Sequence, residues 1–206
     1  MRYELEPALW WALWCAAHSL LIVEGWTSWL QSRLGGLYRF YRLFYNTFSI
    51  LTLVWVLEAG RAARLGAQWD WPGAWQGLRL LLLTVGVALF YAGARRYDWR
   101  QFLGWRQIRG EGGGAGIKAD GGIDRAGVLG LTRHPWYLAG MLVVWARPLY
   151  GSDVAVNAVL CGYFVVGAWL EERKLLRRFG DEYRQYRREV SMLFPFKWLL
   201  GSGRLP

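Results

Sequence analysis

Two cationic side chains stand directly before a proline that opens an apolar run, within residues 132–140. Proline is tolerated in the first turn of a helix because its missing N–H would be unpaired there, so Arg133 and His134 should lie at a helix N-terminus. Cations at the positive end of a helix dipole are unfavourable unless an anion joins them. Glu171 and Glu172 end the next apolar run and can supply that anion. The sequence therefore predicts an ionic cluster that holds a charged ligand or, alternatively, a plain ion pair that fixes two helices.

Apolar residues come in blocks of roughly membrane-spanning length, and these blocks must position the cluster. Hydrophobic residues make up 54% of the 206-residue chain, which contains 15 Trp. A net charge of +10 in a soluble protein would suggest a nucleic-acid partner. Here the cations stand between and after the apolar blocks, as in cytoplasmic loops of membrane proteins. We therefore expect an integral membrane protein in contact with membrane lipids, without a nucleic-acid partner.

The expected fold is an all-α helical bundle of about five membrane spans in a single domain, residues 1–206. Three spans are expected at about 7–30, 43–57 and 78–93. The apolar run from 135 to about 170 is too long for one crossing and is broken at 147–153, so it should form a helical hairpin. The domain then divides into the first three spans (1–96), a cytoplasmic loop (97–133), the hairpin (134–171) and a cytoplasmic tail (172–206).

The loop and the tail have distinct compositions. Glycines at 112–116 follow no strand and precede no Lys-Ser/Thr pair, so a flexible linker is favoured over a phosphate-binding loop. In the tail, apolar residues recur at helical spacing opposite a charged face, which predicts an amphipathic helix. Gly180 should break this helix, with Asp181 as the N-cap of a second segment.

Two ionisable residues and two cysteines fall within apolar blocks. His18 and Glu24 lie in the first block, and an ionisable group at membrane depth is by default a functional hypothesis. The alternative is that His18 only bonds a neighbouring helix and that Glu24 lies near the far membrane interface, at the end of the span. Cys15 and Cys161 suggest neither a disulfide framework nor a metal site, so we expect buried, inert thiols.

Several motifs resemble a known family. RHPWY, about thirty apolar residues, EERKLLRRFGDEYRQY and VSMLFP are similar to the C-terminal signature of the isoprenylcysteine carboxyl methyltransferases and their bacterial relatives. Shorter stretches resemble the methanethiol S-methyltransferase branch: His18-Ser19, YRLFYN at 41–46, YDWRQFLGWRQ at 97–107 and WARP at 145–148. The chain departs from many relatives at 127–129, where Gly-Val-Leu replaces Gly-x-Tyr.

The resemblance implies an S-adenosylmethionine-dependent enzyme of the bacterial inner membrane, with its cofactor held at the cytoplasmic face. The cofactor-binding residues it implies are Arg133, His134, Pro135, Tyr137, Glu171, Glu172, Leu131 and Gln107; Tyr183 and Tyr186 match the tail pattern. The cofactor's carboxylate suits the cations, its ammonium suits Glu171 or Glu172, and its sulfonium suits aromatic faces such as Trp136, Tyr137 and Trp145.

A thiol acceptor must lose its proton from a free pKa of about 8.5, which a nearby cation favours. We expect His18 or Arg147 to help in this catalytic role, provided that Arg147 lies near the pocket. The leading expectation is methyl transfer to a small thiol such as methanethiol. Alternatives are a prenylcysteine carboxylate or a phospholipid amine as acceptor, or a non-catalytic membrane protein on the same scaffold, such as an accessory protein of nitrogen-oxide metabolism. A transporter is disfavoured, because no broken helix pair stands out.

Overall fold

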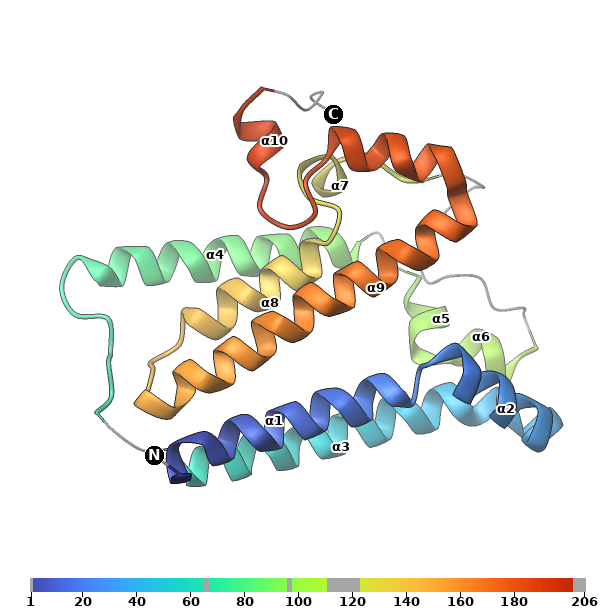
Figure 1. The fold of residues 1–206 in the computed structure, drawn as a ribbon, viewed down its shortest axis with the longest axis horizontal. Helices are drawn as coiled ribbons and strands as arrows, with labels where there is room; N and C mark the ends of the chain where they lie inside the picture. Colours follow the sequence, from blue (N-terminus) through green and yellow to red (C-terminus); the bar gives the residue numbers. More distant parts are fainter. Residues whose placement is uncertain (1, 65–66, 96–97, 111–122, 202–206) are drawn as a thin grey trace. The chain divides into compact units, whose positions relative to one another are not determined.

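The computed structural model describes residues 2–64, 67–95, 98–110 and 123–201 (Figure 1). Within these ranges the chain is helical and contains no strand beyond two isolated bridges, so the predicted all-α class is confirmed. Two compact units are distinguished and are described separately below. The expected glycine-rich linker at 112–116 lies outside the described residues.

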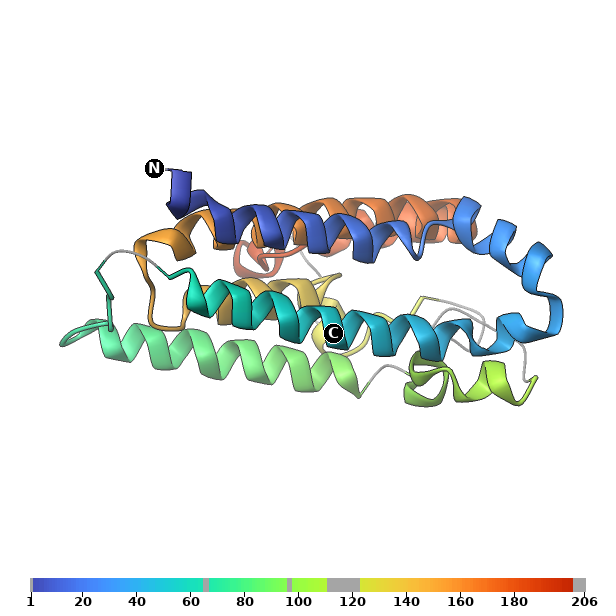
Figure 2. The same ribbon diagram turned by 90° about the horizontal axis from the view of Figure 1, so that it is seen from below.

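The first unit comprises Met1–Ala67, Tyr97–Ile117 and Tyr150–Leu160. Its helices are α1 (Arg2–Leu20), α2 (Glu24–Leu34), the 3-10 helix η1 (Gly35–Phe40), α3 (Tyr41–Ala62), α5 (Trp99–Leu103) and α6 (Trp105–Ile108). Both ribbon views show α1 beside α3 (Figures 1 and 2). Side chains also join the two helices, since Trp14 Nε1 donates a hydrogen bond of 3.1 Å to Thr52 Oγ1.

The first apolar block differs from the expected single span at about 7–30. Helix α1 ends at Leu20, and α2 begins at Glu24 after a short turn in which Val23 is extended. Glu24 lies in the first turn of α2, where the helix dipole favours a negative charge. The acidic residue expected near an interface therefore starts a new helix.

The second unit comprises Gln68–Arg96, Lys118–Leu149 and Cys161–Pro206. Its helices are α4 (Trp75–Ala94), α7 (Val128–Leu131), α8 (Pro135–Trp145), most of α9 (Gly151–Glu189) and α10 (Phe196–Leu199). Helices α4 and α8 pack closely at two glycines. A Cβ added to Gly86 would lie 2.9 Å from Val143 Cγ2, and one added to Gly93 would lie 2.6 Å from the Trp136 ring. Small residues let apolar helices approach this closely in membranes.

Helices α8 and α9 form the expected hairpin and run antiparallel (Figure 1). Between Cys161 and Gly167, α9 packs on α8. Trp145 Nε1 lies 3.3 Å from Cys161 Sγ, Tyr137 stacks on Phe164, and a Cβ on Gly140 would lie 2.8 Å from the Phe164 ring. The hairpin therefore returns the chain toward the residues that precede α8.

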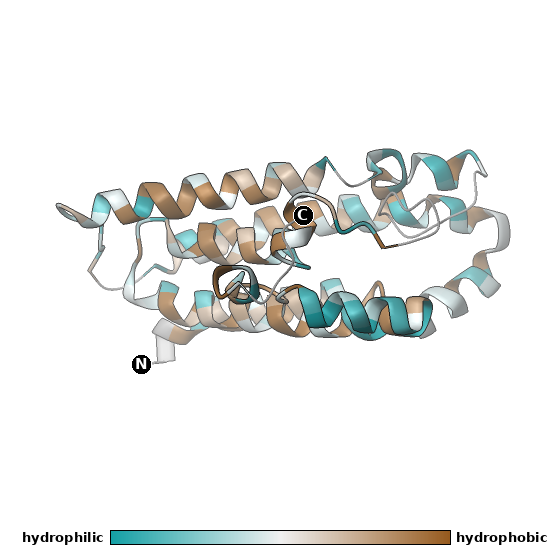
Figure 3. Cartoon of the chain, turned by 90° about the horizontal axis from the view of Figure 1, so that it is seen from above, coloured by the Kyte–Doolittle hydropathy of each residue, from teal (hydrophilic) through white to brown (hydrophobic). Residues whose placement is uncertain are grey.

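Helix α9 is broken at Gly180, as expected from the sequence. Gly180 has φ 54° and ψ −122°, values that non-glycine residues rarely adopt. Figure 3 shows that the segment of α9 after the kink is mostly hydrophilic. Helix α4, in contrast, is mostly hydrophobic. Beyond the first turn of α9, charged residues begin at Glu171, so the kink at Gly180 lies within the charged part of α9 and redirects it.

Three stretches of the described chain are long and apolar enough to cross a membrane: Glu24–Ala62, Trp75–Ala94 and Gly151–Glu189. Helix α8 is apolar but shorter. Large apolar side chains on these helices are exposed, including Leu51, Leu81 and Val87. Apolar surface of this extent is typical of lipid contact, which confirms the prediction of a membrane protein.

Candidate functional site

The residues before α8 are held by the tail of the chain. Arg133 N donates to Ser191 O at 3.0 Å, and His134 N donates to Met192 O at 3.2 Å. Thr132 is buried, and its Oγ1 donates to Met192 O at 3.1 Å. Pro135 then starts α8, as expected for a proline in the first turn of a helix, and is itself buried. The tail and the start of α8 therefore form one structural element.

Arg133 and Glu172 form a buried ion pair in this element. Arg133 Nε lies 2.7 Å and Nη2 lies 2.5 Å from Glu172 Oε1, and both side chains are almost inaccessible to solvent. Arg187, from the charged part of α9, adds a second cation with its Nε 3.1 Å from Glu172 Oε2. Glu172 therefore joins the start of α8 to both segments of α9.

All three nitrogens of the Arg133 guanidinium point at protein oxygens. Nε and Nη2 face Glu172, while Nη1 donates to the carbonyl oxygens of Val190 and Arg187. A fully paired guanidinium positions its neighbours and has little capacity left for a ligand. The cation expected to bind a cofactor carboxylate is thus committed to the protein itself.

His134 lies between the two carboxylates. Its Nδ1 is 3.5 Å from Glu171 Oε2, and its Nε2 is 3.4 Å from Glu172 Oε1. Burial on its own would lower the pKa of His134, but the adjacent Glu171 and Glu172 outweigh burial and raise this pKa above its usual value. Nε2 is buried and faces Glu172 Oε1.

Two further groups beside the cluster have capacity for a ligand. The Glu171 side chain is 33% exposed, whereas that of Glu172 is 5% exposed. Tyr183 is buried, yet its hydroxyl has no hydrogen-bond partner among the described residues. Buried polar groups without partners are rare and need a reason such as a bound molecule. Tyr183 Oη and the Glu171 carboxylate therefore have hydrogen-bonding capacity that a charged, polar ligand could use.

Aromatic rings flank the cluster on α8. The Tyr137 ring stacks on His134 with centroids 5.5 Å apart, and also on Phe164. Trp136 is turned toward α4, because its Nε1 donates to Phe90 O at 3.0 Å and its ring stacks on Phe90. Trp145 is the last residue of α8, about 15 Å from Pro135 along the helix axis. Of the three expected aromatic contacts, the structure brings only Tyr137 beside His134.

Two more residues of the expected set belong to the second unit. Leu131 ends α7, one residue before the buried Thr132, and is half-buried. Arg147 follows the other end of α8, where its Nε donates to Val144 O and its carbonyl oxygen accepts from Trp71 Nε1 at 3.0 Å. The structure therefore places Leu131 next to the cluster and Arg147 away from it.

The remaining expected residues belong to the first unit. His18 lies on α1, with Nε2 2.7 Å from Tyr45 Oη, Nδ1 3.1 Å from Ser49 Oγ and its ring stacked on Trp14. Gln107 lies on α6, where its Nε2 donates to Gln101 O and its buried Oε1 has no partner among the described residues. His18 thus bonds a neighbouring helix, as one of its two sequence interpretations proposed.

Sequence reasoning missed Arg187 and underrated Tyr183. Both reach the cluster only because Gly180 turns the second segment of α9 back toward Arg133. The repeated tyrosines and arginines of the tail were a signal of a packed face, but not of its partner. The paired backbone at Ser191–Met192 gave no signal, because any sequence can form such hydrogen bonds.

The fold and the cluster define an all-helical membrane protein in which a charged tail closes over the start of an apolar hairpin. The chain belongs to the NnrU family, whose profile, described as NnrU protein, matches residues 8–202. No solved structure matches the chain significantly.

Three curated relatives match shorter stretches. Methanethiol S-methyltransferase 1 of Bradyrhizobium diazoefficiens is 47% identical over 67 residues, which cover 32% of this chain and 24% of the relative. Methanethiol S-methyltransferase of Mycobacterium tuberculosis is 45% identical over 66 residues, 32% of this chain and 27% of that protein. The chloroplastic 15-cis-zeta-carotene isomerase of Zea mays is 32% identical over 84 residues, 39% of this chain and 23% of the isomerase. The matches thus span about a quarter of the length of these relatives.

Proposed function

We propose that this chain is an integral membrane methyltransferase that uses S-adenosylmethionine to methylate a small thiol such as methanethiol. The observation that carries the proposal is the likeness to methanethiol S-methyltransferases, which reaches 47% identity over 67 residues. The isomerase match is weaker, at 32% identity over 84 residues. The ionic cluster at the start of α8 is the part of the structure that we assign to the charged methyl donor.

The residues of the cluster suit the amino-acid end of S-adenosylmethionine. Glu171 is the more accessible carboxylate, and it is the group we assign to the ammonium. The Tyr183 hydroxyl has no hydrogen-bond partner among the described residues. It is the donor that we assign to the carboxylate of the cofactor, together with the His134 imidazole. Glu172 and Arg133 are positioning residues in this assignment, because they bond each other.

The Tyr137 ring is the aromatic surface we assign to the sulfonium. It stacks on His134 and therefore lies at the cluster. An aromatic face stabilises a cation by about 0.5–2 kcal/mol, depending on how far the site excludes water. When bound, the cofactor supplies an electrophilic methyl group on a positively charged sulfur. The chain's contribution is to orient that group and to keep water away from it.

The residues proposed to act on the thiol acceptor are chosen from the sequence alone. We propose that His18 or Arg147 favours loss of the thiol proton, whose free pKa is about 8.5. They belong to different units of the structure. Normal turnover in both His18→Ala and Arg147→Ala would remove them from the mechanism. We further propose a bacterial inner membrane location, with the cluster on the cytoplasmic side where the methyl donor is made.

A headspace assay tests the activity. Purified full-length protein receives S-adenosylmethionine labelled in its methyl group together with methanethiol, and labelled dimethyl sulfide is measured in the gas phase. Glu171→Gln should raise the KM for the methyl donor about tenfold or more, because a charged hydrogen bond is worth about 1.5–3 kcal/mol. The matched control is Glu58→Gln, which removes an exposed carboxylate paired with Arg61 and should leave the KM unchanged.

Calorimetric binding of the methyl donor separates the possible failures. Donor binding without labelled sulfide would reject methanethiol, and a panel of prenylcysteine and phospholipid acceptors would follow. Absence of both binding and transfer in the folded protein would reject the methyltransferase proposal and favour a non-catalytic member of the scaffold. Equal effects of Glu171→Gln and Glu58→Gln would reject the assignment of Glu171.

A further inference from the structure

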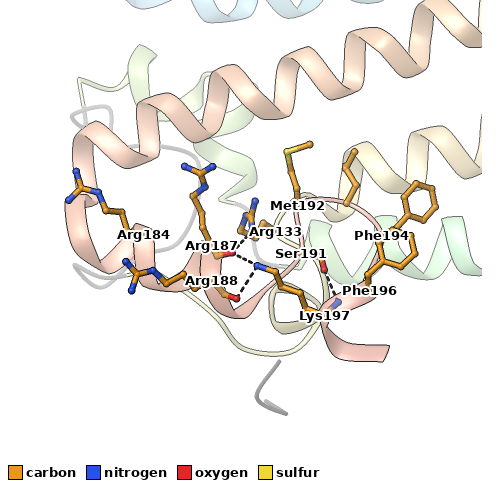
Figure 4. Close-up of a pocket in the computed structure, with 10 residues that line it drawn as sticks. Arg133, Arg184, Arg187, Arg188, Ser191, Met192, Phe194, Phe196 and Lys197 are labelled. Carbon is orange, nitrogen blue, oxygen red and sulfur yellow. Dashed lines mark hydrogen bonds between the residues drawn. The ribbon is translucent and has the colours of Figure 1, made fainter. Parts of the chain in front are cut away.

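A basic groove lies in the second unit, lined by the end of α9, the residues that follow it and Arg133 (Figure 4). Its volume is about 780 Å³. Five of its lining residues are cations, and none is acidic: Arg133, Arg184, Arg187, Arg188 and Lys197. Apolar side chains, including Phe194 and Phe196, complete its lining.

The cations of the groove are only partly neutralised. Arg133 and Arg187 share Glu172, and Arg184 pairs with the highly exposed Asp181. Arg188 is exposed and has no carboxylate partner among the described residues. An anion bound in the groove would therefore relieve repulsion among like charges.

Lys197 is fixed in the groove by the backbone of the tail. Its Nζ donates to Arg187 O at 2.6 Å and to Arg188 O at 2.9 Å, as the dashed lines in Figure 4 mark. Desolvation is the main reason that the pKa of Lys197 lies below its usual value, and the charges of Arg133 and Arg187 lower this pKa further. The ammonium is thus held among other cations, an arrangement that an anion would stabilise.

Hydrogen bonds between the tail and the start of α8, and between α8 and α4, place the groove near the ends of these two apolar helices. The C-terminal end of α4 meets the start of α8, since Trp136 Nε1 donates to Phe90 O. The tail is bonded directly before that point, through the hydrogen bonds of Ser191 and Met192 with Arg133 and His134. Because α4 is long and apolar enough to span a membrane, its end marks the level of the lipid headgroups.

An exposed apolar flank adjoins the cations. Phe194 and Phe196 line the groove and are 46% and 62% exposed. Leu199 and Leu200 follow at 64% and 80% exposure. Aromatic and aliphatic side chains beside a basic cluster are typical of segments that lie in the interface of an anionic membrane.

We infer that this groove is a docking site for the headgroups of anionic phospholipids. Arg184, Arg187, Arg188 and Lys197 bind the headgroup phosphate, and the exposed apolar flank enters the acyl region beside it. The lack of a carboxylate in the lining makes the groove unsuitable for a cationic ligand. The groove therefore suits an anion, whereas the Glu171 side of the cluster suits a cationic group. Each basic residue near an anionic membrane contributes favourably to binding, so several together select anionic over zwitterionic lipid.

Native mass spectrometry of the full chain in a neutral detergent tests the inference. The probes are dioleoyl phosphatidylglycerol and dioleoyl phosphatidylcholine, which share acyl chains and differ in headgroup charge. The wild type should prefer phosphatidylglycerol by about tenfold or more, as expected for several basic contacts. Arg184→Gln/Arg188→Gln should abolish most of this preference. The change leaves Arg133, Arg187 and Glu172 in place.

The control variant Arg177→Gln/Arg178→Gln removes the same charge from exposed positions on α9 before the kink, outside the groove. It should keep the preference for phosphatidylglycerol. Phe196→Ser should weaken binding of both lipids, because it removes apolar surface without changing charge. Unchanged thermal unfolding of each variant in detergent establishes that it is folded.

Three results would overturn the inference. The first is an equal lipid preference in the wild type and in Arg184→Gln/Arg188→Gln. The second is an equal loss in Arg177→Gln/Arg178→Gln, which would reflect net charge rather than the groove. The third is displacement of the lipid by an equal concentration of sn-glycerol 3-phosphate, which would show that the groove takes soluble phosphate esters instead of a membrane surface.

Discussion

Arg133 and Glu172 stand 39 positions apart in the chain and form the buried ion pair on which the start of α8, the end of the apolar part of α9 and the tail converge. Neither charge faces solvent, so each depends on the other for compensation. Arg187 and His134 complete the neighbourhood of the Glu172 carboxylate. The pair is therefore the central element of the second unit.

Removing one partner of this pair should strongly destabilise the protein. Glu172→Gln leaves the buried Arg133 without its anion, and such changes cost about 3–5 kcal/mol. Thermal unfolding in detergent, followed by tryptophan fluorescence, measures the effect as a lower Tm. Glu58→Gln is the matched control, because its partner Arg61 is exposed and surface pairs contribute only about 0–1 kcal/mol.

A double variant separates the pair from other effects. Replacing both residues, as Arg133→Met/Glu172→Leu, removes the uncompensated charge and should recover part of the stability lost in Glu172→Gln. A double variant less stable than Glu172→Gln would mean that Arg133 matters chiefly through the carbonyl oxygens of Val190 and Arg187.

The ion pair itself could be predicted from the sequence, whereas its surroundings could not. The polar break after α8 predicted a hairpin, and a hairpin returns Glu171 and Glu172 toward Arg133, although α8 is shorter than the part of α9 that precedes Glu171. Choosing Glu172 over Glu171 required the rotation of α9 about its axis. A shift of one residue rotates a side chain by about 100°, which hydrophobic pattern fixes poorly in a helix apolar on many sides.

The approach of the tail also lay beyond the sequence. Gly180 indicated a break, but the direction of the chain after it depends on a positive φ together with the packing of Tyr183 and Tyr186. The turn between α1 and α2 was missed for a related reason. Residues 20–23 are all apolar, so composition alone continued the span through them.

His134 should make stability depend on pH. The pKa of His134 is raised in the folded state, so its stabilising contribution is fully present below the unfolded pKa of about 6.5 and is lost as pH rises through the folded pKa. The Tm of the wild type should therefore fall relative to that of His134→Gln as pH is raised from about 6 to 9. Parallel Tm curves for the two proteins over this range would contradict the raised pKa.

Removal of the hydroxyl should change the stability of the protein differently at the two buried tyrosines of the tail. Tyr186 Oη donates to Leu129 O at 2.7 Å, so Tyr186→Phe should cost about 1 kcal/mol. Tyr183 Oη has no partner among the described residues, so Tyr183→Phe should be neutral or slightly stabilising without ligand. If Tyr183 serves the methyl donor, Tyr183→Phe should weaken donor binding measured by calorimetry. A Tyr183→Phe variant with lower Tm and normal donor affinity would assign the hydroxyl to the fold.

Close packing of α4 on α8 should depend on Gly93. A Cβ added there would lie 2.6 Å from the Trp136 ring and 3.4 Å from Pro135 Cγ, so the ring that donates to Phe90 O would have to move. Gly93→Ala should therefore cost about 1–3 kcal/mol, as overpacking usually does.

Gly77→Ala is the control within the same helix, because nothing lies within 4 Å of the added Cβ. Alanine favours a helix over glycine by about 1 kcal/mol, so Gly77→Ala should leave the Tm unchanged or raise it. Because Trp136 follows His134 and Pro135 directly, Gly93→Ala should also weaken donor binding, and an unchanged donor affinity would mean that the cluster tolerates movement at the start of α8.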